Sequence, residues 1–173
     1  VYTSYEGKGG VDLSSSFKKA VFAVKFKTEK ILLSSDIIPK SRILYYRNII
    51  ERARKIAPFL LYDADPYIVV SKDGRLFWII DAYTVSNRVP YSKPLNKKIN
   101  YIRNSVKVLV DAYNGSLNFY ISDPNDVIMK VYGAIFPKLF LPLSEMDDDL
   151  RKHIRYPKGF LQIQASMFST YHM

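Results

Sequence analysis

Four aspartates are the residues in this sequence whose type and spacing could support chemistry. Asp63 and Asp65 alternate in the segment Asp63-Ala64-Asp65-Pro66, and carboxylates spaced in this way supply oxygen ligands to cations such as Ca²⁺. The further ligands, the glycine and the distal glutamate of a calcium loop are missing, so the segment also fits a turn in which Asp63 binds local amides. We predict no metal site or cofactor here, and a cation-dependent envelope enzyme using the aspartates is the alternative function.

Asp81 and Asp111 lie inside apolar, β-branched runs, where aspartate is disfavoured. A buried carboxylate needs a partner, and Arg88 or Arg103 could supply the positive charge. If the two runs pair with each other, the acids could instead lie together, which would raise one pKa. No supporting pattern of His, Ser or Lys accompanies them, so we predict structural ion pairs and assign no catalytic residue.

Basic residues are concentrated in the first part of the chain. The whole sequence has 26 Lys and Arg against 16 Asp and Glu, a formal charge of +10, which favours anionic partners. Residues 1–58 hold 12 basic and 5 acidic side chains, whereas residues 105–173 hold seven of each. The candidate binding residues are Lys18, Lys19, Lys25 and Lys27 in a predicted first helix, and Arg88, Tyr91, Lys93, Lys97 and Lys98 in a basic linker.

The first predicted helix, from Phe17 to about Leu33, is amphipathic, and its pattern leaves two interpretations open. Phe17, Val21 and Val24 share one helical face, with lysines on another. The apolar face could cover the core while the lysines stay in solvent. Alternatively, the helix could lie on an anionic membrane surface with its phenylalanines, Phe17, Phe22 and Phe26, towards lipid.

Helices flank two hairpins in the predicted order of elements. Pro39 begins a second helix that ends before Pro58. Residues 67–84 and 105–122 predict two β-hairpins, over Asp73-Gly74 and Asn114-Gly115, separated by the basic linker 85–104. Further helices follow from residues 123, 144 and 157. The prediction is an α+β fold with two N-terminal helices, a four-stranded antiparallel sheet from two β-hairpins, and C-terminal helices, in a single domain over residues 1–173.

The composition and the two ends of the chain exclude some kinds of site and indicate what kind of protein this is. Cysteine is absent, which excludes disulfides, thiolate zinc sites and a cysteine nucleophile. The longest stretch without a charged residue, 159–173, is shorter than the ~18–20 apolar residues that a membrane span requires. The first residue is Val1, and the last predicted helix has no terminating residue, so we expect a piece of a longer protein.

Several strings along the chain resemble one protein family. They include YEGKGGV (5–11), SRILYYRNI (41–49), RKIAPFL (54–60), YDADPY (62–67), LFWIIDAYT (76–84), NYIRNSVK (100–107), DAYNG (111–115) and FLPLSEM (140–146). The sequence resembles an uncharacterised bacterial family of multi-spanning membrane proteins with a large soluble C-terminal region, and the resemblance covers the whole chain. It implies membrane helices elsewhere in the protein and an extracytoplasmic position for this part, and it brings no catalytic or binding residues.

Together these observations predict a binding module rather than an enzyme. We expect an extracytoplasmic domain of an integral protein of the cell membrane that contacts anionic lipid, an anionic wall polymer or a protein partner. The first helix and the linker would make the contact. A nucleic-acid-binding domain is the third alternative, which an extracytoplasmic position disfavours, and no RNP, KH or zinc-finger pattern organises the basic residues.

Overall fold

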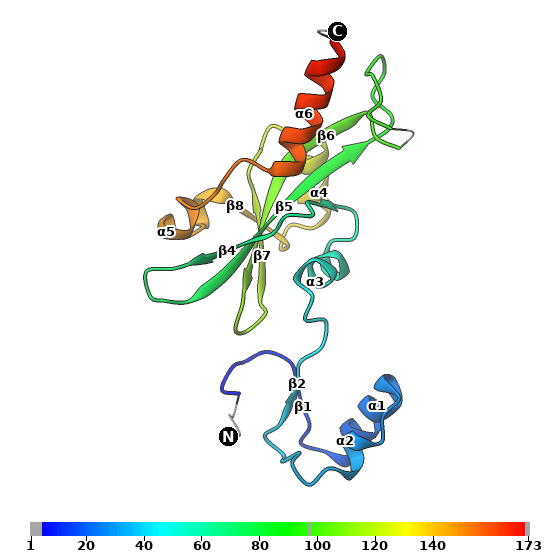
Figure 1. Cartoon of the computed structure of the whole chain (residues 1–173), viewed down its shortest axis with the longest axis vertical. Helices are drawn as coiled ribbons and strands as arrows, with labels where there is room; N and C mark the ends of the chain where they lie inside the picture. The colour runs from blue at the N-terminus through cyan, green and yellow to red at the C-terminus, as the bar shows by residue number, and fades with distance from the viewer. Residues whose placement is uncertain (1–4, 97, 172–173) are drawn as a thin grey trace. The chain divides into compact units, whose positions relative to one another are not determined.

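The computed structural model describes residues 5–96 and 98–171, and the chain divides between Arg47 and Asn48 into two compact units. Unit 1 comprises the residues up to Arg47, and unit 2 comprises those from Asn48 onward. Figure 1 labels most of the elements of both units. The predicted single domain over residues 1–173 stays a prediction, because the division describes compactness and not independent folding.

From residue 5 onward, unit 1 consists of one short antiparallel strand pair and two helices. Its elements are β1 (Val11–Asp12), α1 (Ser16–Phe26), α2 (Lys30–Leu33) and β2 (Arg42–Ile43). In the strand pair, Val11 lies opposite Ile43. Gly10 has a φ of +72°, and a Cβ there would lie 2.5 Å from the Ile43 carbonyl oxygen, so this close approach requires glycine. The Arg42 guanidinium holds the residues before β1 in place by donating to the carbonyl oxygens of Gly9 (2.7 Å) and Gly10 (3.1 Å).

The first helix ends earlier than predicted. It stops at Phe26 because Lys27 adopts the left-handed conformation, with φ 51°. The N–H groups of Lys27 and Thr28 then donate to the carbonyl oxygens of Val24 (3.2 Å) and Ala23 (2.9 Å), which closes the last turn. The residues up to Leu33 form the separate short helix α2.

The predicted start of the second helix at Pro39 is wrong. The segment after it is extended, and Arg42 pairs with β1 instead of continuing a helical pattern. Tyr46 has a φ of 53°, which a right-handed helix cannot contain. Helix α3 (Ile49–Ile56) begins only after Asn48, whose side chain accepts a hydrogen bond from the Glu51 N–H at 3.0 Å.

Unit 2 is built on a mixed six-stranded sheet, so the α+β class is confirmed while the predicted four-stranded sheet is too small. The strands are β3 (Leu61–Tyr62), β4 (Tyr67–Val70), β5 (Leu76–Ser86), β6 (Tyr101–Asp111), β7 (Leu117–Ile121) and β8 (Phe140–Pro142). Their order is β3-β5-β6-β7-β8, with β4 also paired to β5, and β8 runs parallel to β7. Both hairpins occur as predicted, with Gly74 and Gly115 at positive φ in their turns.

Strands β5 and β6 include the residues at both ends of the predicted linker 85–104. They pair antiparallel along their length, and Val85 and Ser86 lie opposite Ile102 and Tyr101. The described part of the connection that remains, residues 87–96 and 98–100, lies at one end of the two long strands (Figure 1). Strand pairing therefore extends into the predicted linker from both sides.

The two faces of the sheet bury separate apolar clusters. Helix α3 and helix α4 (Val127–Ile135) cover one face, where Ala53 and Met129 pack with Ile80. On the other face, Ile79 packs in a cluster that contains Leu150. Adjacent strand residues point to opposite faces, so Ile79 and Ile80 belong to different clusters. The remaining elements are the 3₁₀ turn η1 (Leu143–Glu145), α5 (Asp148–Arg151) and α6 (Lys158–Tyr171). No helix in the described ranges has both the length and the apolar character that crossing a bilayer demands.

Candidate functional site

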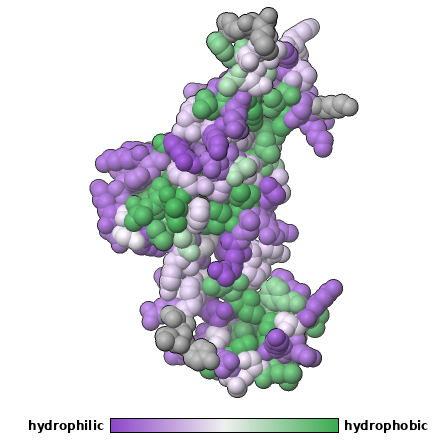
Figure 2. Space-filling model, in the orientation of Figure 1, coloured by the Kyte–Doolittle hydropathy of each residue, from purple (hydrophilic) through white to green (hydrophobic). Residues whose placement is uncertain are grey.

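Helix α1 presents the main candidate surface of unit 1, because one of its two apolar faces is buried and the other is exposed. Phe22 and Ala23 are buried, so this face packs inside unit 1. The outer apolar stripe, which we define as Phe17, Val21 and Val24, is exposed by 77%, 47% and 79% respectively. Figure 2 shows apolar side chains gathered over the α1–α2 region among polar ones. The prediction that these three residues share a face is thus correct, but this face does not cover a core.

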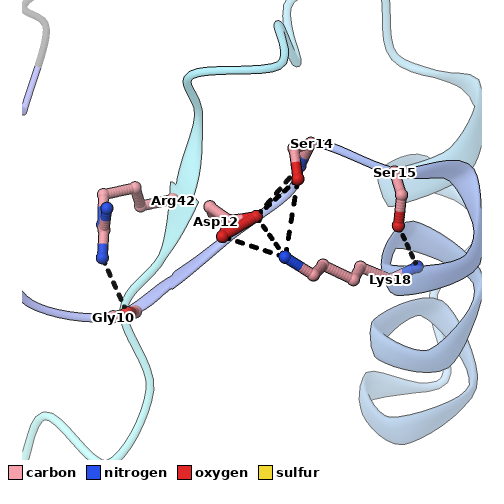
Figure 3. Close-up of polar contacts among 6 residues, drawn as sticks. All are labelled: Gly10, Asp12, Ser14, Ser15, Lys18 and Arg42. Atoms are coloured by element: carbon pink, nitrogen blue, oxygen red, sulfur yellow. Dashed lines mark hydrogen bonds and ion pairs between the residues drawn. The ribbon is translucent and has the colours of Figure 1, made fainter.

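Lys18 is engaged within unit 1 by an ion pair (Figure 3). Its ammonium group donates to both carboxylate oxygens of Asp12, and the Ser14 hydroxyl donates to the same carboxylate at 2.6 Å. The hydrogen bonds from Lys18 and then Ser14 lower the pKa of Asp12 to about 2. The helix itself begins at the same place, since the Ser15 hydroxyl oxygen accepts from the Lys18 N–H at 3.3 Å.

The other predicted lysines of unit 1 have different surroundings. Lys19 donates to the Ile37 carbonyl oxygen at 3.1 Å, which ties α1 to the segment before β2. The ammonium of Lys25 lies over aromatic rings, the nearest being Tyr45 at 4.3 Å from the ring centroid. Lys27 is exposed at the left-handed end of α1. The structure therefore brings three of the four lysines into contacts inside unit 1 and leaves Lys27 facing solvent.

The second candidate surface is the β5–β6 loop in unit 2. Arg88, Lys93 and Lys98 lie in it, and Lys97 falls outside the described residues. Tyr91 is fully exposed and has a φ of 60°, a conformation that bulky side chains rarely adopt. Asn100 fixes the base of this loop, because its side-chain amide donates to the Val89 carbonyl oxygen at 2.8 Å and accepts from the Val89 N–H at 3.3 Å.

The predicted aspartates of the first acidic segment form a turn. Asp63 is buried, and its carboxylate accepts hydrogen bonds from the Tyr83 hydroxyl, the Asp65 N–H at 2.9 Å and the Gly159 N–H at 3.1 Å. Burial first, and the bond to Asp63 second, raise the pKa of Tyr83. Asp65 pairs at the surface with Arg155 at 2.9 Å. This geometry agrees with the turn interpretation, in which Asp63 binds local amides.

Asp81 and Asp111 are in ion pairs, but not with the arginines that the sequence suggested. The β5–β6 register places Lys107 directly opposite Asp81, and the two side chains form a buried pair. Asp111 pairs with Arg75 from the first hairpin turn. Arg103 instead lies opposite Thr84. The two acids do not meet, and no group of three or more acidic or histidine side chains in the described ranges is placed to hold a metal ion.

A buried polar cluster around Asp126 was not predicted. Its carboxylate accepts hydrogen bonds from the hydroxyls of Ser105 (2.6 Å), Tyr101 (2.6 Å) and Thr84. It also caps α4 by accepting from the Ile128 N–H at 3.1 Å. Burial raises the pKa of Asp126, but the hydrogen bonds outweigh it, so the pKa is lowered. An aspartate directly before an apolar helical run is a capping signal, whereas its strand partners follow only from the fold.

Two clefts in unit 2 contain some of these residues. One, of ≈ 380 Å³, is lined by Arg75 and Asp111 near the hairpin turns. The other, of ≈ 410 Å³, is lined by Asp63, Tyr83 and Lys158 near the start of α6. The carboxylates in both clefts already bind neighbouring side chains, as described above.

Comparison with known proteins places this chain among a set of close relatives. A family model described as an uncharacterised protein family (UPF0182) matches residues 1–173. A UPF0182 protein from Pelobacter propionicus is 68% identical over 173 residues, and one from Geotalea uraniireducens is 67% identical. A third, from Moorella thermoacetica, is 51% identical. In each case the match covers 100% of this chain and 19% of the relative. No solved structure matches the chain.

Proposed function

This chain belongs to the UPF0182 family. We propose that it is a membrane-surface binding module in which unit 1 contacts anionic lipid. The outer apolar stripe of α1 is the observation that carries the proposal. An apolar helical face that remains exposed after folding marks a surface that interacts with something else. Its residues, Phe17, Val21 and Val24, have the i, i+4, i+7 spacing of helices that lie in the plane of a bilayer interface.

Apolar burial supplies the first part of the binding free energy. Transferring a valine or phenylalanine side chain out of water contributes about 1.5–3 kcal/mol when burial is complete. Phe17 and Val24 are more than three-quarters exposed, so nearly all of that contribution is still available to a partner. Phe22, in contrast, is buried within unit 1 and does not reach lipid. The lipid-facing residues are therefore the outer apolar stripe and not the phenylalanine set Phe17, Phe22 and Phe26.

The charge of unit 1 favours anionic lipid over an uncharged apolar partner. Unit 1 contains nine Lys and Arg against four Asp and Glu, a formal charge of +5. Lys27 and Lys30 are exposed at the end of α1 and the start of α2, close in sequence to Val24. Each basic residue near an anionic bilayer contributes about 1 kcal/mol, and salt weakens this contribution.

The β5–β6 loop is a second proposed contact on the same kind of surface. It combines basic side chains with the exposed ring of Tyr91, and aromatic rings beside basic residues are enriched at membrane interfaces. The rare backbone conformation of Tyr91 supports a role for the ring, since such conformations concentrate at binding sites. Loop and stripe belong to different units.

We place the module on the extracytoplasmic side of the cell membrane. The resemblance to multi-spanning membrane proteins supports this placement. The relatives also have room for membrane helices, because the match covers only 19% of their length. Wall polymer and a protein partner are the other possible ligands of the same surface, and the experiment below separates them from lipid.

Vesicle flotation tests the proposal. The full chain is mixed with phosphatidylglycerol-containing vesicles or with neutral phosphatidylcholine vesicles, at low and at high salt. We expect binding to the anionic vesicles at low salt, and loss of most of it at high salt. The variant Val24→Ser should weaken binding about tenfold, because about 1.4 kcal/mol of apolar burial is lost.

Val127→Ser is the matched control. Val127 is a helical valine of similar exposure (70%), but it lies on α4 in unit 2, so binding should not change. Far-ultraviolet circular dichroism shows whether both variants keep their helices. The lipid proposal fails if the chain does not float with anionic vesicles at low salt, or if Val24→Ser binds like the original chain. Binding to anionic wall polymer without vesicle binding would also overturn it.

A further inference from the structure

Four aromatic rings surround the ammonium group of Lys25 in unit 1. The ring of Tyr45 is nearest, with its centroid 4.3 Å from the Nζ atom. The other centroids lie at 5.6 Å for Tyr46, 5.9 Å for Phe22 and 6.0 Å for Phe26. All four distances are within the range in which a ring face attracts a cation. We call this group of rings, Phe22, Phe26, Tyr45 and Tyr46, the aromatic cage.

The cage is held together by contacts between its own rings. Phe22 and Phe26 stack at 5.9 Å between centroids, and Tyr45 lies 5.8 Å from Phe22 and 5.0 Å from Tyr46. Phe22 is buried and anchors the group to the interior of unit 1. Tyr46 takes part despite its φ of 53°, a left-handed conformation that is costly for a bulky residue. Such a conformation persists when the surrounding structure fixes it, and it occurs often at ligand-binding sites.

The cage has an open side. Phe26 and Tyr46 are exposed by 43% and 38%, and Lys25 itself is exposed. In the part of the chain that the structure describes, Lys25 has no carboxylate partner, so the rings are the groups that its charge meets. A side chain held only by ring faces at an open rim can leave without breaking an ion pair.

We propose that the aromatic cage is a binding site for an organic ammonium ion, above all a quaternary one, and that Lys25 occupies it in the absence of ligand. Cages of aromatic rings recognise quaternary ammonium groups through the negative potential of the ring faces. The lysine ammonium is strongly hydrated, which disfavours its stay among rings. A trimethylammonium group is less hydrated, so it loses less on moving from water to the ring faces and displaces Lys25. This site lies on other residues than the outer apolar stripe and requires no anionic lipid.

Variants of Lys25 in the full chain test the cage. Lys25→Gln removes the resident cation, and Lys25→Arg keeps a cation in place. Tetramethylammonium chloride, with sodium chloride at matched ionic strength as the control salt, is titrated against each protein and followed by the tyrosine ring resonances in NMR spectra. We expect saturable binding by Lys25→Gln that is at least about tenfold tighter than in the original chain, and no such gain for Lys25→Arg. Adding Tyr45→Leu to Lys25→Gln should abolish the binding.

The inference is overturned if folded Lys25→Gln protein shows no saturable shift, or if Tyr45→Leu leaves the shift unchanged. A measurement on the original chain covers the case in which Lys25→Gln does not fold. There, high tetramethylammonium should move the Lys25 ε-methylene resonances away from their ring-shifted positions, and sodium should not. Unmoved resonances would refute displacement.

Two further ligands distinguish the sources of the ammonium group. If the ligand is a lipid headgroup, Lys25→Gln will bind neutral phosphatidylcholine vesicles as well as choline. If it is a small cation, the variant will bind choline alone. Neither arm contains anionic lipid, so a negative result here leaves the proposed binding of unit 1 to anionic vesicles untouched.

Discussion

The buried ion pair between Lys107 and Asp81 should make unit 2 far more sensitive to losing one charge than to losing both. The two side chains are only 5% and 3% exposed, and they face each other across β5 and β6. Water therefore cannot replace a missing partner. Removing the carboxylate by Asp81→Ala leaves a buried ammonium without a counter-charge, which costs about 3–5 kcal/mol of unfolding free energy.

Replacing both residues by apolar side chains should not destabilise unit 2. In the double variant Asp81→Leu with Lys107→Met, no charge is buried, and replacements of this kind are neutral or stabilising by about 1–4 kcal/mol. The side-chain amide of Asn104 approaches Asp81 at 3.4 Å and loses only a weak contact. The exposed pair between Asp65 and Arg155 is the control, and Asp65→Asn should cost about 0–1 kcal/mol.

Urea unfolding provides the assay. The sequence contains one tryptophan, Trp78, which lies in β5 and packs against the cluster under α3 and α4. Its fluorescence therefore reports the unfolding of unit 2 without interference from unit 1. The reasoning is refuted if Asp81→Ala loses less than about 1 kcal/mol, or if the double variant is as unstable as the sum of the single changes.

Two further predictions concern carboxylates whose pKa values are lowered. Asp126→Ala should destabilise unit 2 by about 2–4 kcal/mol. Buried hydroxyls such as that of Ser105 lose their charged acceptor, and α4 loses its N-terminal cap. Urea unfolding measures the loss of unfolding free energy. The pKa of Asp126 is lower in the folded state than in the unfolded state. Its contribution to the unfolding free energy is therefore present above the unfolded pKa and is lost as pH falls through the folded pKa. If Asp126→Ala lost the same amount of unfolding free energy on acidification as the original chain, this reasoning would be contradicted. In unit 1, an NMR titration of Asp12 should show a midpoint at about 2, and Lys18→Met should move that midpoint upward; an unchanged midpoint would argue against the ion pair.

The sequence determined the features that depend on a few neighbouring residues. Asp73-Gly74 and Asn114-Gly115 predict the two hairpins correctly, because glycine supplies the positive φ that a tight turn between strands needs. The apolar, β-branched runs of β5 and β6 likewise predict strands, and the start of α6 after Pro157 follows from helix-start chemistry. The family resemblance also came from the sequence, and the match over residues 1–173 shows the family.

Tertiary structure decided which apolar face of α1 is buried. The pattern of the helix offers two such faces, one with Val24 and one with Phe22, and hydropathy alone does not show which of them is buried. Packing of Phe22 with Tyr45 selects the inner face and leaves Val24 outside. The segment between Pro39 and Tyr46 shows the same limit, since pairing of β2 with β1 replaces the helix that Pro39 was predicted to begin.

Register across the sheet decided the partners of the aspartates. Asp81 meets Lys107 only because β5 and β6 pair with one particular offset, including an irregularity between Ala82 and Thr84. A shift by one residue would turn every side chain of a strand to the opposite face, so pairing is fixed by the burial of the whole strand and not by the residues beside each acid. Local chemistry therefore specifies turns and helix starts, whereas the choice of face, register and ion-pair partner depends on contacts between residues far apart in the chain.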